Sequence, residues 1–481
     1  MCNPLVRASR LGLCLLAGSL APGFGRAAGS TPDPRPRLLV LTDIGGDPDD
    51  RQSMIRLMTY ANEFVIEGLV ASASGTPGEL KEAVVRPDLI REIVDAYATV
   101  QPNLVRHDPR YPPAAGLRAV VKAGNPQRGR AHIGAGHDTE GSQWIIARAD
   151  QADPRPLNIA VWGGQTDLAQ ALWRVRSDRG EAGFARFATR LRVHDIADQD
   201  GIQSWMAQEF PGLFYVLDKA PPGRERREAV FRGMYLDGDL DLTSRAWIDA
   251  HVREGHGALG ALYPTRTWTA PNPHGVLKEG DTPSWFFFLP NGVNDPAHPD
   301  WGGWGGRFER VDNGVFRDAP DRLGEEAHPR VGVWRWRPAF QADFQARMDW
   351  CVRAPDAANH APRISVKSPE GGLAVVDDGP DRGAYGILRL VTEAGRRVRL
   401  DASDSQDPDG DVLRFRWWIH EAPGRESRAA TLESAGTASA SLALPVNPPR
   451  SEVHVVVEAT DDGEPALTSF QRLVVEVKGG G

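Results

Sequence analysis

Short apolar runs alternate along the chain with longer segments in which apolar residues recur every three or four positions. Before residue 355 this pairing occurs four times. An apolar run of this length fits a buried strand, and regular alternation with helices is typical of a mostly parallel sheet covered by helices. The expected pairs of strand and helix are 37–41 with 50–61, 64–72 with 88–100, 157–162 with 166–176, and 190–196 with 202–210.

The pattern changes near residue 355, after which apolar and polar residues alternate at every second position. Runs of this kind are 396–403, 413–421, 440–446 and 451–459, with Gly, Pro and Asp turns between them. This periodicity predicts strands with one buried face, and several such strands predict an Ig-like β-sandwich. We therefore expect an α/β domain over 37–353, a linker over 354–363 and a sandwich over 364–481. A chain ending near Pro355 should then fold alone.

The amino-terminal segment has the order of features found in export signals. Two arginines precede an apolar stretch over 11–24, and small residues follow at Ala27 and Ala28. This order predicts a secretory signal peptide over 1–28, followed by a linker over 29–36. The apolar stretch is too short to span a membrane comfortably, and no later run of about twenty apolar residues replaces it. We therefore expect a secreted or periplasmic protein with no membrane partner.

Charge and cysteine content narrow the classes of function. The formal net charge is -8 at pH 7, with acidic and basic residues interleaved. Nucleic-acid binding needs a clustered cationic surface, so we expect no nucleic-acid partner. Of the three cysteines, only Cys351 lies outside the predicted signal, which excludes an internal disulfide. The oligomeric state stays open.

One acidic stretch is the strongest chemical signal in the chain. LTDIGGDPDD, residues 41 to 50, contains Asp43, Asp47, Asp49 and Asp50, at the point where the first predicted strand gives way to the first predicted helix. Ligands of parallel sheets bind beyond the carboxyl ends of the strands. Carboxylates this close raise one another's pKa unless a cation neutralises them, and their oxygens suit Ca²⁺ or Mg²⁺; export favours Ca²⁺. Alternatively, Asp49 and Asp50 only stabilise the start of the helix, which explains two of the four carboxylates.

Three motifs follow one another along the chain: LTDIGGDPDDRQS, IAVWGGQTDLAQAL and LPNGVNDPAHPDWGGWGGRF. Together they resemble the nucleoside hydrolase superfamily, and within it a group of secreted bacterial proteins described as nucleoside-hydrolase-like or cellulose-binding, with a carboxy-terminal β domain. In that family the first motif holds one Ca²⁺, the second offers a backbone carbonyl to it, and the third supplies the last carboxylate. The resemblance covers about residues 37 to 350. The ligand set that it implies is Asp43, Asp49, Asp50, the Trp162 carbonyl and Asp295.

The chain departs from this family pattern at the positions that carry catalysis. The family's second Asp, which acts as metal ligand and general base, falls on Gly45. We therefore expect Asp47, two positions further on, or Asp43 to act as the base. The family's proton-donating His falls on Asn294, and the Asn-rich segment that binds ribose has no clear counterpart. These departures argue against nucleosides as substrates.

Gly-rich loops contain side chains of the kinds that bind sugars. Aromatic faces pack on the C–H patches of a sugar, and polar side chains bind its hydroxyls. Alternatively, such loops only pack against one another. The predicted sugar-binding residues are Asp138, Gln199, Asp200, Asn291, Asn294 and Trp301, and the predicted general acid is Glu140 or Asp198.

These features predict a secreted, Ca²⁺-dependent glycosidase with a carbohydrate substrate, in which a metal-oriented water attacks an anomeric carbon. Two alternatives stay open. One is an N-glycosidase acting on nucleosides. The other is a non-catalytic polysaccharide-binding protein, for which Gly45 is the chief argument. In the predicted sandwich, the acids of LDASDSQDPDGDV either form tight turns or bind a second ion.

Overall fold

The computed structural model describes residues 33–73, 83–266, 276–312, 314–369, 371–376, 383–421, 430–447 and 452–478. The predicted signal peptide over 1–28 and the first residues of the predicted linker over 29–36 lie outside these ranges. The residues from Pro34 onward form one unit by their contacts. Among the described residues, no helix has the length and apolar character needed to cross a membrane.

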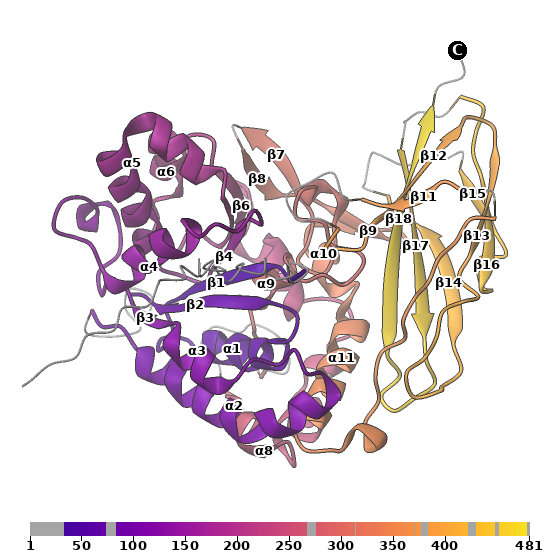
Figure 1. Ribbon diagram of the computed structural model, residues 1–481, viewed down its shortest axis with the longest axis horizontal. Helices are drawn as coiled ribbons and strands as arrows, with labels where there is room; N and C mark the ends of the chain where they lie inside the picture. The colour runs from indigo at the N-terminus through magenta and orange to yellow at the C-terminus, as the bar shows by residue number, and fades with distance from the viewer. Residues whose placement is uncertain are drawn as a thin grey trace, which may run out of the picture. The chain divides into compact units, whose positions relative to one another are not determined.

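An eight-stranded sheet forms the centre of the first part of the chain (Figure 1), with the order β3-β2-β1-β4-β5-β6-β8-β7. Its strands are parallel except for β7, which pairs with β8 in the antiparallel sense. The mostly parallel α/β fold predicted from the sequence is confirmed. The strands are β1 (Arg37–Thr42), β2 (Val65–Ala71), β3 (Val121–Ala123), β4 (Leu157–Val161), β5 (Leu191–Ile196), β6 (Phe214–Asp218), β7 (Phe308–Asp312) and β8 (Val315–Asp318).

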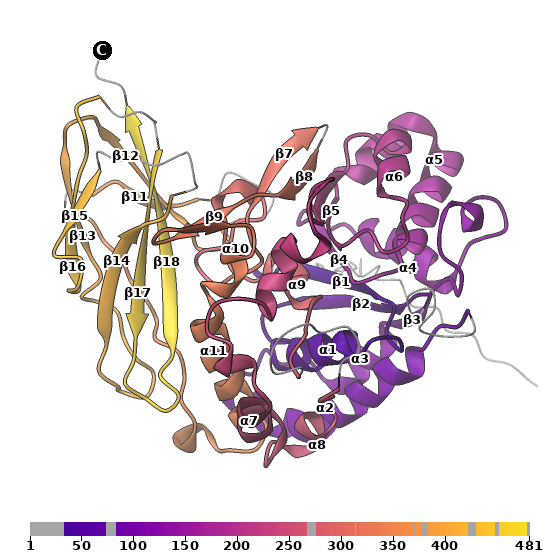
Figure 2. The same cartoon turned by 180° about the vertical axis from the view of Figure 1, so that it is seen from behind.

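Helices cover both faces of this sheet, as the two opposite views show (Figures 1 and 2). Successive side chains of β1 point to opposite faces, as the strand geometry requires. Leu38 and Val40 pack with α1, α2, α9 and α11, whereas Leu39 and Leu41 pack with α4, α5 and α6. The helices are α1 (Asp49–Thr59), α2 (Pro87–His107), α3 (Ala114–Ala119), α4 (Glu140–Ala149), α5 (Gln165–Ala188), α6 (Gln203–Glu209), α7 (Arg245–Ile248), α8 (Gly257–Ala261), α9 (Thr282–Phe286), α10 (Val331–Trp334) and α11 (Arg337–Trp350).

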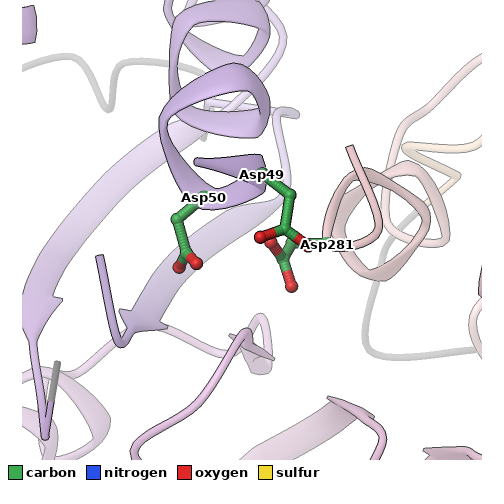
Figure 3. A group of neighbouring side chains, drawn as sticks. All are labelled: Asp49, Asp50 and Asp281. Carbon is green, nitrogen blue, oxygen red and sulfur yellow. The ribbon is translucent and has the colours of Figure 1, made fainter. Parts of the chain in front are cut away.

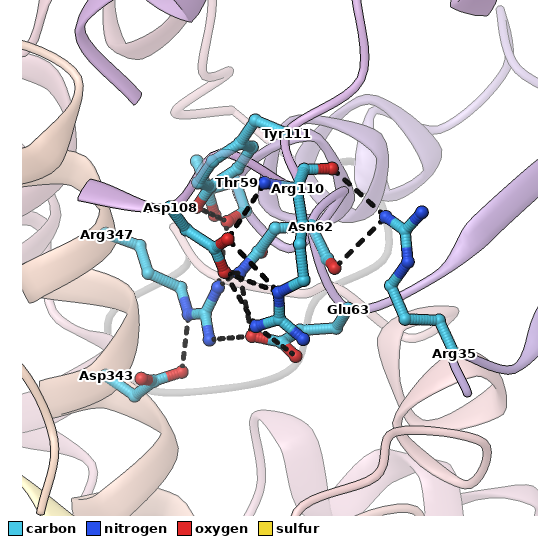
Figure 4. A network of polar contacts seen from close by, with 9 residues as sticks. All are labelled: Arg35, Thr59, Asn62, Glu63, Asp108, Arg110, Tyr111, Asp343 and Arg347. Atoms are coloured by element: carbon cyan, nitrogen blue, oxygen red, sulfur yellow. Dashed lines mark hydrogen bonds and ion pairs between the residues drawn. The ribbon is translucent and has the colours of Figure 1, made fainter. Parts of the chain in front are cut away.

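A polar network fixes the carboxyl end of α1 to its neighbouring helices (Figure 4). Arg347 of α11 donates to the Thr59 carbonyl at 3.1 Å and to Asn62 Oδ1 at 2.9 Å. The same guanidinium pairs with Glu63 at 2.9 Å, and Asn62 donates to Asp108, directly after α2, at 2.8 Å. These contacts hold α1, α2 and α11 together. They fix the position of the carboxyl end of α1.

The carboxy-terminal part is all β, with two main sheets of order β11-β12-β18-β17-β14 and β13-β16-β15. Buried apolar residues such as Leu400, Trp417, Leu442 and Val455 form one cluster between them. The predicted all-β second part is confirmed. Its strands are β11 (Leu373–Val375), β12 (Leu388–Glu393), β13 (Arg397–Asp401), β14 (Arg414–Ile419), β15 (Thr431–Glu433), β16 (Ser439–Ala443), β17 (Glu452–Thr460) and β18 (Thr468–Lys478), and a separate hairpin joins β9 (Asp321–Leu323) to β10 (Glu326–His328).

Strand β18 also contacts the first part of the chain. Phe470 packs edge-on against Trp336, with ring centroids 5.3 Å apart. Arg472 is fully buried and donates to the carbonyls of Val293 at 3.0 Å and Gly302 at 2.7 Å. A chain without the second part would lose these contacts. Independent folding of the first part and the domain boundaries both stay predictions.

Candidate functional site

The site lies where the strand order of the sheet reverses. β1 lies between β2 and β4, and a reversal of this kind opens a crevice at the carboxyl ends of the strands. The acidic stretch runs from the end of β1 into α1. The Thr42 hydroxyl donates to Asp50 and accepts from the Ile44 N–H at 3.1 Å. The turn after β1 is thereby bound to the first residues of α1.

Three carboxylates point toward one another at this place (Figure 3): Asp49 and Asp50 at the start of α1, and Asp281 just before α9. We call them the carboxylate triad. Each offers one oxygen, and these oxygens all lie within 4.8 Å of one another. Asp50 and Asp281 are only 4% and 2% exposed. Asp281 was not among the residues predicted from the sequence, and it comes from a distant segment of the chain.

The electrostatics of the triad favour a bound cation. Burial raises the pKa of Asp50 and of Asp281 well above the usual value, and nearby carboxylates, Asp43 among them, raise it further. Burial also raises the pKa of Asp49, against the opposing effect of the Lys278 ammonium. A cation removes both the repulsion and part of the desolvation cost, so these groups are poised to bind one.

Asp43 and the residues after β4 lie beside the triad. Asp43 is 5% exposed and packs against Gly163, where an added Cβ would lie 2.5 Å from Asp43 Cγ. The preceding Trp162 carbonyl accepts a hydrogen bond from Gln199 Nε2 at 2.6 Å. Arg128 donates to Asp43 Oδ2 at 3.3 Å. A side chain at Gly163 would separate the two strand ends, so the glycine permits Asp43 and the Trp162 carbonyl to lie close together.

A lysine lies among the carboxylates. Lys278 Nζ pairs with Asp47 and lies 3.2 Å from Asp49 Oδ2, and its side chain is only 9% exposed. Burial alone would lower the pKa of Lys278, but Asp49 and Asp47 raise it above the usual value. The lysine is therefore charged, and it engages Asp47, the carboxylate that the sequence suggested as the base.

Residues of α1 also fix the segment that carries Lys278 and Asp281. Gln52 Oε1 accepts hydrogen bonds from the backbone N–H groups of Lys278 at 2.9 Å and Glu279 at 3.1 Å. Arg56 and Glu279 form an ion pair with both side chains fully buried, with 3.1 Å between Nη2 and Oε1. One helix thus supplies two carboxylates of the triad and positions the third.

The donor set fits a hard divalent cation. Calcium takes oxygen ligands at about 2.3–2.6 Å, so two ligands on opposite sides of the ion lie about 4.8 Å apart. The triad oxygens, all within 4.8 Å of one another, meet this limit. Asp43 and the Trp162 carbonyl add oxygen donors at the neighbouring strand ends.

The single sequence signal for Asp281 is its place before Thr-Pro at the start of a short helix, which is common and does not identify a ligand.

Comparison with known proteins assigns the chain to a family. The model for the nucleoside hydrolase-like domain of cellulose-binding Sde182 matches residues 37–308, more than half of the chain. The chain belongs to the Sde182 family. A second model, for the carboxy-terminal domain of cellulose-binding protein Sde0182, matches residues 397–477. The resemblance noted from the sequence is thereby confirmed.

Solved structures agree with this assignment. The chain is similar to a nucleoside hydrolase-related hypothetical protein from Saccharophagus degradans that is associated with carbohydrate metabolism, with 31% identity and a TM-score of 0.75 over 92% of this chain and 100% of that chain. The PKD domain from KIAA 1837 protein matches at 18% identity over 19% of this chain and 82% of that chain, with a TM-score of 0.15, and does not bear on the family. No curated protein matches the chain.

In this Sde182-family chain Asp295 is not one of the carboxylates that form the triad. Its Oδ1 accepts from the Ala297 N–H at 2.9 Å, and its charge acts on the buried guanidinium of Arg472. Among the described residues the group of carboxylates at the start of α1 includes Asp281 and not Asp295, so Asp281 is the better candidate for the last carboxylate ligand, and a role for Asp295 stays a prediction. The turn that holds Asp295 is bound to strand β18, because Arg472 donates to the carbonyls of Gly292 and Val293.

The neighbours of Asp295 that were expected to bind sugar have structural partners. Asn291 Oδ1 accepts from two backbone N–H groups of its own turn. Asn294 donates to the Phe286 carbonyl at 2.6 Å and accepts from the Trp304 N–H at 2.9 Å. Trp301 is 8% exposed and stacks on His298 with ring centroids 3.9 Å apart. These three side chains stabilise the loop before β7.

Asp138 and Glu140 lie at the start of α4. Asp138 pairs with Arg174 and accepts from Gln170 Nε2 at 2.6 Å. Glu140 accepts from the Ala123 N–H at 3.1 Å and pairs with Lys122 at 3.1 Å. Burial would raise the pKa of Glu140, but these two partners lower it overall. A lowered pKa disfavours the proton-donating role expected for Glu140.

The loop after β5 approaches the site through Arg128, which the sequence analysis did not identify. Arg128 Nε lies 3.9 Å from Asp200 Oδ1, and the same guanidinium contacts Asp43. Gln199 reaches the Trp162 carbonyl, as described above. Asp198 pairs with Lys219 at 2.9 Å. The structure therefore brings Gln199 and Asp200 to the same strand ends as Asp43, with Asp198 beside them.

Proposed function

We propose that this Sde182-family chain is a secreted, calcium-dependent glycosidase that acts on an oligo- or polysaccharide. The observation that carries the proposal is the buried carboxylate triad at the strand-order reversal of a nucleoside hydrolase-like sheet. Its oxygens suit calcium, and the solved relative is associated with carbohydrate metabolism. The export signal suggested by the sequence supports a site outside the cytoplasm.

Calcium held by Asp43, Asp49, Asp50 and Asp281 would orient a water and sugar hydroxyls at the carboxyl ends of the strands. Asp47, or Asp43, accepts the proton of the attacking water. Glu140 or Asp198 donates the proton to the leaving oxygen; the partners of Glu140 lower the pKa of that side chain, and Asp198 is paired with Lys219 at 2.9 Å. Attack at the anomeric carbon then passes through a transition state with oxocarbenium character.

A second candidate function is polysaccharide binding without turnover. The ion pair between Asp47 and Lys278 favours it, because a carboxylate engaged by an ammonium is a weaker base. The replacement of the family's second Asp by Gly45 favours it too. An N-glycosidase acting on nucleosides is a third candidate, although Asn294, in the place of the family's proton donor, is bound to backbone groups.

Turnover assays distinguish these functions. The purified chain should release product from aryl β-glucosides or aryl β-cellobiosides in the presence of calcium, and chelation should stop the reaction. Asp281→Asn should lower kcat/KM by about 100-fold, which corresponds to about 2.7 kcal/mol of transition-state stabilisation. Asp295→Asn is the matched control and should retain activity. Product from inosine or uridine would support the N-glycosidase, and sedimentation with cellulose without any product would refute catalysis.

A further inference from the structure

Lys278 has a position that the proposed chemistry does not explain. Its ammonium lies between Asp47 and Asp49, and Nζ is 3.2 Å from Asp49 Oδ2. The Lys278 side chain is only 9% exposed. Asp49 belongs to the triad, whereas Asp47 does not. Asp49 is therefore shared between the lysine and the triad, and the lysine holds Asp47 outside it.

The place of this ammonium is fixed by the fold. The backbone N–H groups of Lys278 and Glu279 both donate to Gln52, and Glu279 is anchored by Arg56. A Cβ added at the following residue, Gly280, would lie 3.4 Å from Asp49 Oδ2, so the segment runs in contact with that carboxylate. The helix that supplies Asp49 thus also positions the lysine, which distinguishes Lys278 from a mobile surface side chain.

We propose that Lys278 is a fixed counter-ion that keeps Asp47 out of the metal's ligand set and lowers the calcium affinity of the site. The inference rests on the proposed function, because it requires calcium at the carboxylate triad. The number of charged ligands sets the affinity of calcium sites, and extracellular modules bind calcium with a Kd of about 10⁻⁴–10⁻³ M. An ammonium beside Asp49 repels the divalent ion and competes for one of its ligands. Lys278 is a positioning residue in this scheme, because it acts through Asp47 and Asp49.

Calcium titration of the metal-free full chain by calorimetry tests this role. Lys278→Met should tighten calcium binding by about tenfold or more, since the repulsion is gone and Asp47 becomes available. Asp47→Asn should weaken binding, because the ammonium then turns to Asp49 alone. The double variant should bind calcium about as the wild type does. Lys278→Arg keeps the charge and should retain the wild-type affinity. Lys122→Met, which removes a lysine paired with Glu140 at 3.1 Å, is the control and should change nothing.

The outcomes separate the inference from the proposed function. If the wild type binds no calcium, the proposed calcium site is wrong, and the inference fails with it. If the wild type binds calcium and Lys278→Met binds it equally or more weakly, the lysine is only a structural support and the inference alone is overturned. If Lys278→Met does not fold, the double variant is compared with Asp47→Asn. An affinity about tenfold tighter in the double variant then supports the inference, and equal affinities overturn it.

Discussion

Replacing Asp281 by Asn should have opposite effects on the metal-free and the calcium-bound protein. The triad oxygens lie within 4.8 Å of one another. At an effective dielectric constant of about 20, two unit charges at that distance repel by about 3.5 kcal/mol. Protonation of the buried carboxyls, whose pKa values are raised, relieves part of this repulsion. Asp281→Asn removes the part of the repulsion that involves residue 281 without changing the shape of the site, and it removes one charge that attracts the ion.

The size of the effect follows from the linkage between binding and folding. Calcium at 100 times its Kd stabilises the folded state by about 2.7 kcal/mol. With an unfolding entropy of about 2.1 cal/mol/K per residue, 1 kcal/mol corresponds to about 1 °C in Tm for a chain of 481 residues. Calcium should therefore raise the wild-type Tm by about 3 °C. If Asp281→Asn weakens binding 100-fold, the same calcium concentration adds only about 0.4 kcal/mol.

Thermal unfolding monitored by tryptophan fluorescence, with calcium or with a chelator, measures these shifts. We expect Asp281→Asn to melt at or above the wild-type Tm in chelator and to show almost no rise with calcium. Asp295→Asn is the matched control, because its carboxylate binds its own turn and acts on Arg472. A full calcium response in Asp281→Asn, or its loss in Asp295→Asn, would show that the metal ligands have been assigned to the wrong segment.

Two further predictions concern other parts of the structure. Burial raises the pKa of Asp218, beside Asp318, to about 8 from 3.8, so its contribution to stability is full below about pH 4 and is lost as the pH rises through about 8. Asp218→Asn should flatten the decline of Tm between about pH 4 and pH 8, and an unchanged slope would exclude this group as its cause. A chain ending at Pro355 should fold alone, but it lacks Phe470 and exposes Trp336, so it should melt several degrees below the full chain. An insoluble truncated chain would show that the sandwich is part of the same core.

The order of strands and helices was predictable because each depends on local periodicity. All four predicted pairs occur, but two helices run longer than the pattern suggested. Helix α2 continues to His107 across Pro102, and α5 continues to Ala188 across Gly180, where the backbone departs from helical geometry. Proline and glycine end helices in sequence-based reasoning. Beyond Pro102, Leu104 is buried, so tertiary packing extends α2 past this local signal, whereas Gly180 does interrupt the helical geometry of α5.

The candidate site was predictable only where its residues are neighbours in the sequence. Asp43, Asp49 and Asp50 come from one turn, and their grouping is visible in the sequence itself. Asp281 and Lys278 approach this turn because Gln52 and Arg56 bind the segment before α9. In the sequence, Gln52 and Arg56 are ordinary polar residues of a helix. No spacing rule connects them with a loop more than two hundred residues away. The positions of Lys278 and Asp281 in the site could therefore not be predicted from the sequence.

The backbone explains why this turn carries Gly45 where the family motif has Asp. Gly45 has a φ of 120°, which glycine adopts freely and other residues adopt only with strain. A turn with this conformation cannot hold a carboxylate at position 45 without strain, so its nearest acidic side chains are Asp43 and Asp47, two residues away on either side. Asp47 in turn meets Lys278, whose charge balances it. The turn thus combines a glycine at a position of positive φ with a carboxylate two residues later that is balanced by an ammonium beside the triad.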